Sequence, residues 1–169
     1  MVATRPRVGD VFTIPVGDSR AGIGQVVATY GKDAYFLAVF ERVVAEDDIS
    51  SVITDVLSDT AVQFLALSLD AKFHIGHWPI VGHAPVRTNV PLPAYKEAVT
   101  TADHIDVVDY SGTRRRRATK EEAALLPNRK VVAPVRLERA LRASLGLEPW
   151  LEAFDDLRPH GITSREAFS

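Results

Sequence analysis

Short apolar runs separated by glycine turns fill the first half of the chain, and they constrain its fold more than any other feature. Residues 11–15 have a strand pattern in which Phe12 and Ile14 share one face. Residues 24–30 resume a β pattern, and residues 35–40 form an apolar run of buried-strand length. Because a Gly-Lys-Asp turn at 31–33 lies between these two runs, the simplest interpretation is a β-hairpin.

Two glycines predict that this β structure is strongly bent. Gly22 ends the turn-rich residues 17–22 and Gly24 follows it, where a bulge or a small-barrel corner needs permissive backbone. They do not form a dinucleotide phosphate loop, because a strand and not a helix follows them. Two more strands are expected at 62–69 and 78–82, and Pro79 places the second at a sheet edge or a strand start.

The second half of the chain has a more helical pattern. An extended, proline-rich connection covers about 84–94, and a further strand is expected at 105–110. Expected helices cover 46–58, 119–126 and 134–145, and a shorter segment begins at Pro149; within the third helix Glu138 and Arg142 can pair. The predicted fold is therefore α+β, with a β-rich N-terminal half built as a strongly bent antiparallel sheet or small barrel, and helices mainly in the C-terminal half.

The composition indicates a single soluble globular domain over residues 1–169, with a loosely held tail at about 159–169. A chain of this length can bury a core, and 46% hydrophobic with 25% charged residues is typical of folded proteins. The absence of cysteine excludes disulfides and thiolate metal sites. No signal core or membrane span is visible, so we expect a cytoplasmic protein. We also expect that it needs no cofactor. The formal net charge of -2 gives no global reason to expect nucleic-acid or membrane binding.

Three histidines are the candidate metal ligands. His74, His77 and His83 lie close together in the sequence, and histidine is a common zinc ligand. If this stretch is extended, His74 and His77 point to opposite faces, which argues against a shared ion. We therefore predict structural or solvent-facing histidines and no metal site. No serine has a nucleophile elbow around it, so we also predict no catalytic residue.

Acidic residues gather around the expected helix at 46–58 and form the first candidate binding surface: Glu46, Asp47, Asp48, Asp55 and Asp59. Asp47 or Asp48 can cap the helix, which explains part of the cluster. The same carboxylates can also face a basic protein by charge complementarity. Acid–base catalysis by a carboxylate pair is disfavoured, because no pocket motif accompanies them.

Four consecutive arginines, Arg114, Arg115, Arg116 and Arg117, are the only basic block and form the second candidate surface. Guanidinium groups bind phosphates and carboxylate-rich surfaces. In a strand these side chains would alternate between two faces. No aromatic residues are interleaved with them as a stacking platform for single-stranded nucleic acid requires, although Tyr110 lies nearby. Nucleic-acid contact through Tyr110 and these arginines stays an alternative, beside a solvated turn or a partner contact.

Several motifs together resemble the bacterial immunity protein 26 family of polymorphic toxin systems. In order along the chain they are Val8-Gly9-Asp10-Val11-Phe12-Thr13-Ile14-Pro15, Gly17-Asp18, Gly22-Ile23-Gly24-Gln25-Val26-Val27, Trp78-Pro79-Ile80-Val81-Gly82-His83, the Asp109-Tyr110-Ser111-Gly112 turn and the helix from Leu137 to Leu145. The resemblance implies a small β-rich α+β protein that binds and neutralises a cognate toxin and is not an enzyme. It carries over no catalytic residue and no residue of toxin contact.

The expected partner is therefore a toxin protein. Many bacterial toxins of this kind act on nucleic acids and are basic, so we expect the acidic residues from Glu46 to Asp59 to make the contact. Two other functions stay open. One is a small-barrel module that contacts nucleic acid through Tyr110 and the four arginines. The other is a small-molecule-binding protein whose pocket residues are scattered along the sequence.

Overall fold

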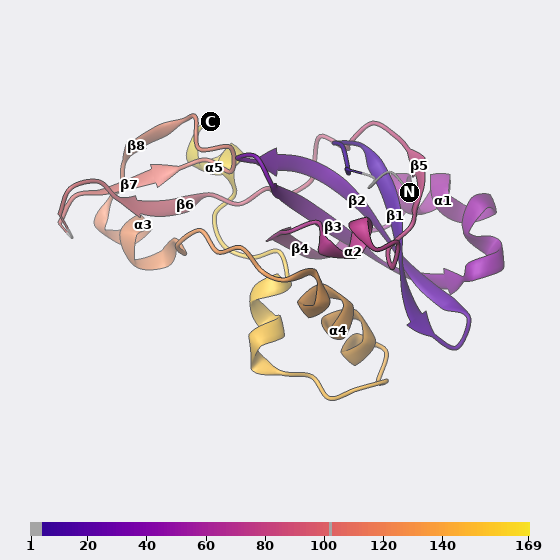
Figure 1. The fold of residues 1–169 in the computed structure, drawn as a ribbon. Coiled ribbons are helices and arrows are strands. Elements are labelled where there is room, and N and C mark those ends of the chain that lie inside the picture. The colour runs from indigo at the N-terminus through magenta and orange to yellow at the C-terminus, as the bar shows by residue number, and fades with distance from the viewer. Residues whose placement is uncertain (1–4, 102) are drawn as a thin grey trace. The chain divides into compact units, whose positions relative to one another are not determined.

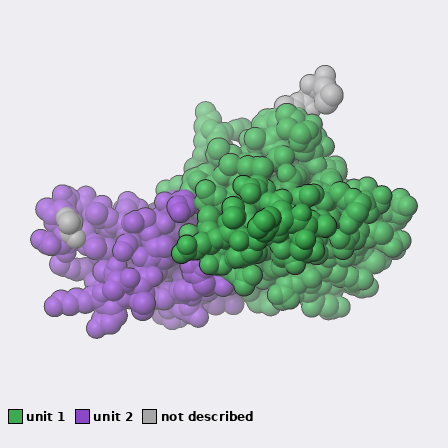
Figure 2. All heavy atoms as spheres, turned by 90° about the horizontal axis from the view of Figure 1, so that it is seen from below, with its two compact units in different colours: residues 1–90, 131–158 green, residues 91–130, 159–169 purple. Residues whose placement is uncertain are grey.

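The computed structural model describes residues 5–101 and 103–169, and Figure 1 shows its elements. The contacts divide the chain into two compact units, coloured separately in Figure 2. Unit 1 contains the described residues up to Val90 together with Val131–Arg158, and unit 2 contains Pro91–Lys130 and Pro159–Ser169. Two compact units of one chain can still unfold together as a single cooperative domain. The single-domain organisation therefore stays a prediction.

A five-stranded antiparallel sheet forms the body of unit 1, in the order β4-β3-β2-β1-β5. The sheet is open, with β4 and β5 at its edges, so the described residues form the predicted bent sheet and no small barrel. The predicted hairpin at residues 31–33 and the edge position of the strand after Pro79 are both confirmed. The strands are β1 (Asp10–Gly17), β2 (Arg20–Tyr30), β3 (Ala34–Ala45), β4 (Val62–Ser68) and β5 (Ile80–His83).

Gly22 and Gly24 lie inside β2, where the pairing register with β3 shifts. Their role is close packing and not a left-handed backbone, because neither has a positive φ. A Cβ on Gly22 would lie 2.5 Å from Cδ2 of Leu141, and a Cβ on Gly24 would lie 2.6 Å from Cε2 of Phe12. The predicted bulge therefore lies where the side chains of Leu141 and Phe12 come close to the β2 backbone.

One face of the sheet is covered by α2 (Ala71–His74), α4 (Pro134–Ser144) and η2 (Glu152–Leu157). The predicted stripe along α4 buries Leu137 and Leu141 in this main core. At its centre Phe12 stacks on Trp78, with the ring centroids 5.5 Å apart. The predicted ion pair between Glu138 and Arg142 is wrong, because both side chains pair with other residues. Glu138 pairs with Lys72 (3.2 Å), and Arg142 pairs with Glu148 (3.1 Å).

The opposite face of the sheet is covered by α1 (Ile49–Asp59), which follows the short 3₁₀ helix η1 (Glu46–Asp48). Val56 is fully buried against Val11, Ile23 and Phe40 of the sheet. Burying a valine side chain fully stabilises the fold by about 1.5–3 kcal/mol relative to leaving it exposed. The helix predicted at 46–58 is therefore confirmed, and its apolar stripe fixes which side of the helix remains in solvent.

Unit 2 contains a separate three-stranded antiparallel sheet in the order β6-β7-β8. Its small core consists of Ala94, Val107, Leu126 and Ala167. The predicted capping box is confirmed: Thr119 Oγ1 accepts the Glu122 N–H at 3.2 Å, and Glu122 Oε1 accepts the Thr119 N–H at 2.9 Å. The elements are β6 (Tyr95–Ala98), β7 (Ile105–Val108), β8 (Arg115–Arg117), α3 (Lys120–Leu125) and α5 (Ser164–Ala167).

Residues 159–169, expected from the sequence to be loosely held, contain α5 and two buried residues, Ser164 and Ala167. This segment pairs with the proline-rich connection, which is extended as predicted, through a bridge between Thr163 and Pro93. None of the helices in the described part of the chain has the length and apolar character that crossing a bilayer requires.

Candidate functional site

The acidic residues lie together on η1 and α1 of unit 1, and we name them the acidic surface: Glu46, Asp47, Asp48, Asp55 and Asp59. All five are exposed. They are exposed because the apolar side chains of α1 recur at helical spacing and turn one face of the helix toward the sheet. The structure thus brings the five residues predicted from the sequence onto one helical segment.

Among the residues that the structure describes, the carboxylates of the acidic surface have no partner inside the fold. Within residues 5–101 and 103–169, none of the five forms an ion pair. The expected capping of α1 by an aspartate side chain is wrong, because Asp48 occupies the N-cap position without a side-chain hydrogen bond to the helix. Its backbone carbonyl instead accepts the Ser51 hydroxyl at 2.8 Å. The whole carboxylate set therefore remains available to a partner.

Arg87, which the sequence did not single out, lies against the end of α1. Its Nη1 donates to the carbonyl of Ser58 at 3.4 Å, and its guanidinium lies 5.1 Å from the ring centroid of Phe40. A cation beside the last carbonyls of a helix is favourable. Nε of Arg87 is buried without a hydrogen-bond partner among the described residues. Arg87 therefore fixes the proline-rich connection beside the acidic helix, and no local sequence pattern predicts this contact.

The arginine run lies in unit 2, where three of its members already have carboxylate partners. Arg115 pairs with Glu97 and Asp106 at 3.1 and 3.2 Å. Arg116 holds Glu122 through two hydrogen bonds of 2.8 and 2.6 Å. These carboxylates neutralise the positive charge through which the arginines would otherwise bind the phosphates of a nucleic acid. Along β8 the residues Arg115, Arg116 and Arg117 pair in turn with Val108, Val107 and Asp106 of β7. Their side chains therefore alternate between the two faces of the sheet.

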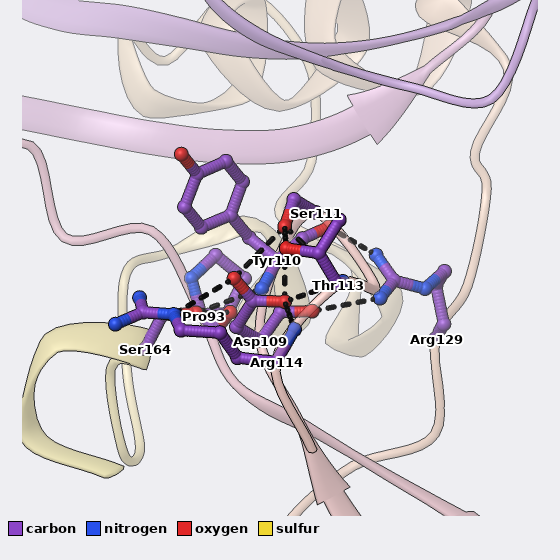
Figure 3. A network of polar contacts seen from close by, with 8 residues as sticks. All are labelled: Pro93, Asp109, Tyr110, Ser111, Thr113, Arg114, Arg129 and Ser164. Carbon is purple, nitrogen blue, oxygen red and sulfur yellow. Dashed lines mark hydrogen bonds and ion pairs between the residues drawn. The ribbon is translucent and has the colours of Figure 1, made fainter. Parts of the chain in front are cut away.

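Arg114 belongs to a buried polar network around Asp109, shown in Figure 3. Asp109 is only 2% exposed, and its carboxylate accepts the Ser111 hydroxyl at 2.8 Å and the Thr113 and Arg114 N–H groups at 3.0 and 3.1 Å. Nε of Arg114 adds an ion pair at 3.4 Å. The network closes the turn between β7 and β8, so the Asp-Tyr-Ser-Gly motif is a structural turn.

Two distant residues complete the network in Figure 3. Arg129 donates to the backbone carbonyls of Tyr110 and Asp109 at 2.7 and 3.0 Å. The Tyr110 N–H donates to the hydroxyl of Ser164 at 2.8 Å, and that hydroxyl donates to the Pro93 carbonyl at 2.7 Å. Tyr110 is half-buried within this turn. It is therefore not the exposed aromatic residue that the nucleic-acid interpretation requires.

The pKa shifts in unit 2 have simple physical causes. Burial alone would raise the pKa of Asp109, but hydrogen bonds from the Arg114 backbone and the Ser111 hydroxyl outweigh it and lower that pKa below its ordinary value. Hydrogen bonds from Arg116 lower the pKa of Glu122 to about 2. Burial raises the pKa of Tyr95 to about 12, although the guanidinium of Arg129 lies 4.3 Å from its ring. At neutral pH the Asp109 and Glu122 carboxylates are therefore charged and Tyr95 is neutral, and the two carboxylates accept the hydrogen bonds described above.

The three histidines do not meet at one site. His74 pairs with Asp70 at 3.0 Å, His83 pairs with the buried Asp10 at 3.0 Å, and His77 is exposed. Among residues 5–101 and 103–169, no group of three potential ligands is placed to hold a metal ion. The histidine pairs instead fix local structure. The contact between His83 and Asp10 ties β5 to the start of β1, and Asp10 also accepts the Arg7 N–H at 2.8 Å.

A comparison with protein families finds a match to the Immunity protein 26 model over residues 7–103. The match contains the sheet of unit 1, the acidic surface and β6. Two further segments that resemble the family, the Asp109 turn and α4, lie outside the matched range. No curated protein and no solved structure matches the chain.

Proposed function

The chain belongs to the immunity protein 26 family, and from this premise we propose that it binds a cognate toxin protein and neutralises it by direct protein–protein contact. Such inhibition needs surface complementarity and no activated nucleophile or metal. The family implies an inhibitor and not an enzyme, and the buried carboxylate of Asp109 and the paired histidines have structural partners.

We further propose that the acidic surface makes the toxin contact. The observation that carries this proposal is that its five carboxylates are exposed and have no ion pairs within the described residues. A group of carboxylates without ion pairs raises the rate at which a basic protein associates, and it repels acidic proteins. The partner that fits is therefore a basic toxin, of the kind that acts on nucleic acids. The pairing of Arg115 and Arg116 disfavours direct nucleic-acid binding by this chain.

The test is co-expression with any toxin-like protein that is recovered with this chain or encoded beside it, combined with charge reversal. The test variant carries Asp47→Lys, Asp48→Lys and Asp55→Lys. The control carries the same charge change at three exposed acids outside the acidic surface: Asp103→Lys, Glu121→Lys and Glu152→Lys. We expect the original chain and the control to restore growth and to form a stable complex. We expect the test variant to bind at least roughly a hundredfold more weakly, a loss of about 2.7 kcal/mol.

Two results would contradict different parts of the proposal. If the original chain neither restores growth nor binds the toxin, the immunity function is wrong for this partner. If the test variant binds as tightly as the control, the chain is an immunity protein whose contact lies elsewhere. Circular dichroism of both variants separates lost binding from lost folding.

A further inference from the structure

The segment 159–169 supplies part of the core of unit 2 although it is distant in sequence from the rest. Ala167 is buried beside Ala94, Val107 and Leu126, and Ile162 and Phe168 pack around them. The other core residues all come from the segment 91–130. Unit 2 therefore buries its apolar side chains fully only when both segments are in place.

Polar contacts attach the segment 159–169 to the proline-rich connection. The Ala94 N–H donates to the Ile162 carbonyl at 3.0 Å, and the Ser164 N–H donates to the Leu92 carbonyl at 2.8 Å. Ser164, which is 2% exposed, uses its hydroxyl to join the Pro93 carbonyl to the Tyr110 N–H. Removing one partner from such a buried network leaves the other groups without hydrogen bonds and without water, which is unfavourable.

The same segment also holds the arginine run. Nε and Nη2 of Arg116 donate to the Ala167 carbonyl at 3.1 and 3.0 Å. The ring of Phe168 lies 5.1 Å from the guanidinium of Arg114 and 5.7 Å from that of Arg116. A guanidinium group over the face of an aromatic ring is attracted to it electrostatically. The segment thus connects the core, the Asp109 turn and β8.

We propose that residues 159–169 act as a clasp that closes unit 2. Helix α5 is a single short turn of Ser164–Ala167, and an isolated helix of this length is unstable in water. Its structure therefore depends on docking, and so does the closed form of unit 2. Release of the clasp removes Ala167 from the core, leaves the Tyr110 N–H without Ser164 and takes Phe168 away from Arg114 and Arg116. The clasp belongs to unit 2 and does not depend on the proposed toxin contact.

The test uses the full chain with a specific protease site inserted at the exposed residues His160 and Gly161. After cleavage the 162–169 peptide is removed, and amide hydrogen exchange is followed by NMR. We expect exchange in β6, β7 and β8 to become at least roughly a hundredfold faster, while β2 and β3 keep their protection. Adding back a synthetic 162–169 peptide should restore slow exchange in unit 2. Slow exchange in β6 to β8 without the peptide would overturn the clasp.

Point variants test the same idea in the uncut chain. Ala167→Asp places a charge in the small core and should open unit 2, whereas Ser169→Ala, at an exposed position of the same segment, should leave exchange unchanged. Ser164→Ala removes the bridging hydroxyl and should accelerate exchange in unit 2 by roughly tenfold. The amides of unit 1 serve as the internal reference. If Ala167→Asp leaves exchange in β6 to β8 at the original rate, the proposal is wrong.

Discussion

At the scale of single residues, the two charged clusters that the sequence singles out differ in how the fold uses them. Three of the four consecutive arginines in unit 2 are used within the fold, since Arg114, Arg115 and Arg116 pair with carboxylates. The carboxylates of the acidic surface have no ion pairs within the described residues. Sequence alone identified both groups as candidates, because clusters of one charge are visible without a structure. It did not separate them, because the partners of an arginine are fixed by strand pairing and helix position.

Asp109 is the residue on which the turn between β7 and β8 most depends. In an Asp109→Asn variant the amide NH₂ would face the donors of Ser111, Thr113 or Arg114 in place of an accepting oxygen. We expect unit 2 to lose roughly 1–3 kcal/mol of stability. Amide exchange of β7 and β8 measures this loss. The exposed Asp103→Asn is the matched control, and equal exchange in both variants would show that the network contributes nothing.

Glu122 makes unit 2 sensitive to acid. Its pKa is lowered to about 2 in the folded chain, chiefly by hydrogen bonds from Arg116, against an ordinary value of 4.5. A lowered folded pKa contributes stability that is fully present above about pH 4.5 and is lost as the pH falls toward about 2. We expect the NMR titration of the Glu122 carboxyl to show a low midpoint. Arg116→Ala should move that midpoint upward, and an ordinary midpoint in the original chain would refute the assignment.

At the scale of elements, close packing of β2 makes its two glycines hard to replace. In Gly24→Ala the new methyl group would lie 2.6 Å from Phe12 Cε2 and 2.8 Å from the Ala38 carbonyl oxygen, which belongs to the backbone. We expect a loss of about 1–3 kcal/mol. In Gly82→Ala the nearest atom is Cδ1 of Ile53 at 3.7 Å, an ordinary contact. Chemical denaturation should therefore leave Gly82→Ala close to the original chain, and equal losses in the two variants would exclude close packing as the cause.

Elements with a clear local pattern were predictable from the sequence. The strands of unit 1, α1, α3 and α4 follow apolar periodicity, turn residues or a capping box. Three other elements, α2, β6 and α5, were missed because their stability comes from distant partners: the single turn of α2, for example, buries Phe73 against Phe12 of β1. The strand β6 pairs with β7 and, through Lys96, bridges to Asn128, and α5 docks on Pro93 and Tyr110. For the same reason Arg129 and Ser164 carry no local signal of their place in the Asp109 network.

At the scale of the whole molecule, the small net charge conceals an uneven distribution between the two units. Unit 1 contains 11 Lys and Arg against 15 Asp and Glu, and unit 2 contains 9 against 7. The formal net charge of -2 for the chain therefore arises from an acidic unit and a mildly basic one. The net charge excluded a strong general attraction to polyanions, but it did not exclude a local field around the acidic surface.

This local field predicts how toxin association depends on salt. Long-range attraction between the acidic surface and a basic toxin is screened as the Debye length falls from about 10 Å near 0.1 M salt to about 3 Å at 1 M. We expect the association rate, measured by stopped-flow fluorescence, to fall by roughly tenfold or more over that range. Changing Glu46, Asp47, Asp48, Asp55 and Asp59 to their amides should flatten this dependence. The dissociation rate should change less, because exposed charges act mainly on encounter. If the original chain and the amide variant show the same salt dependence, the toxin does not approach through the acidic surface, even where the two proteins form a stable complex.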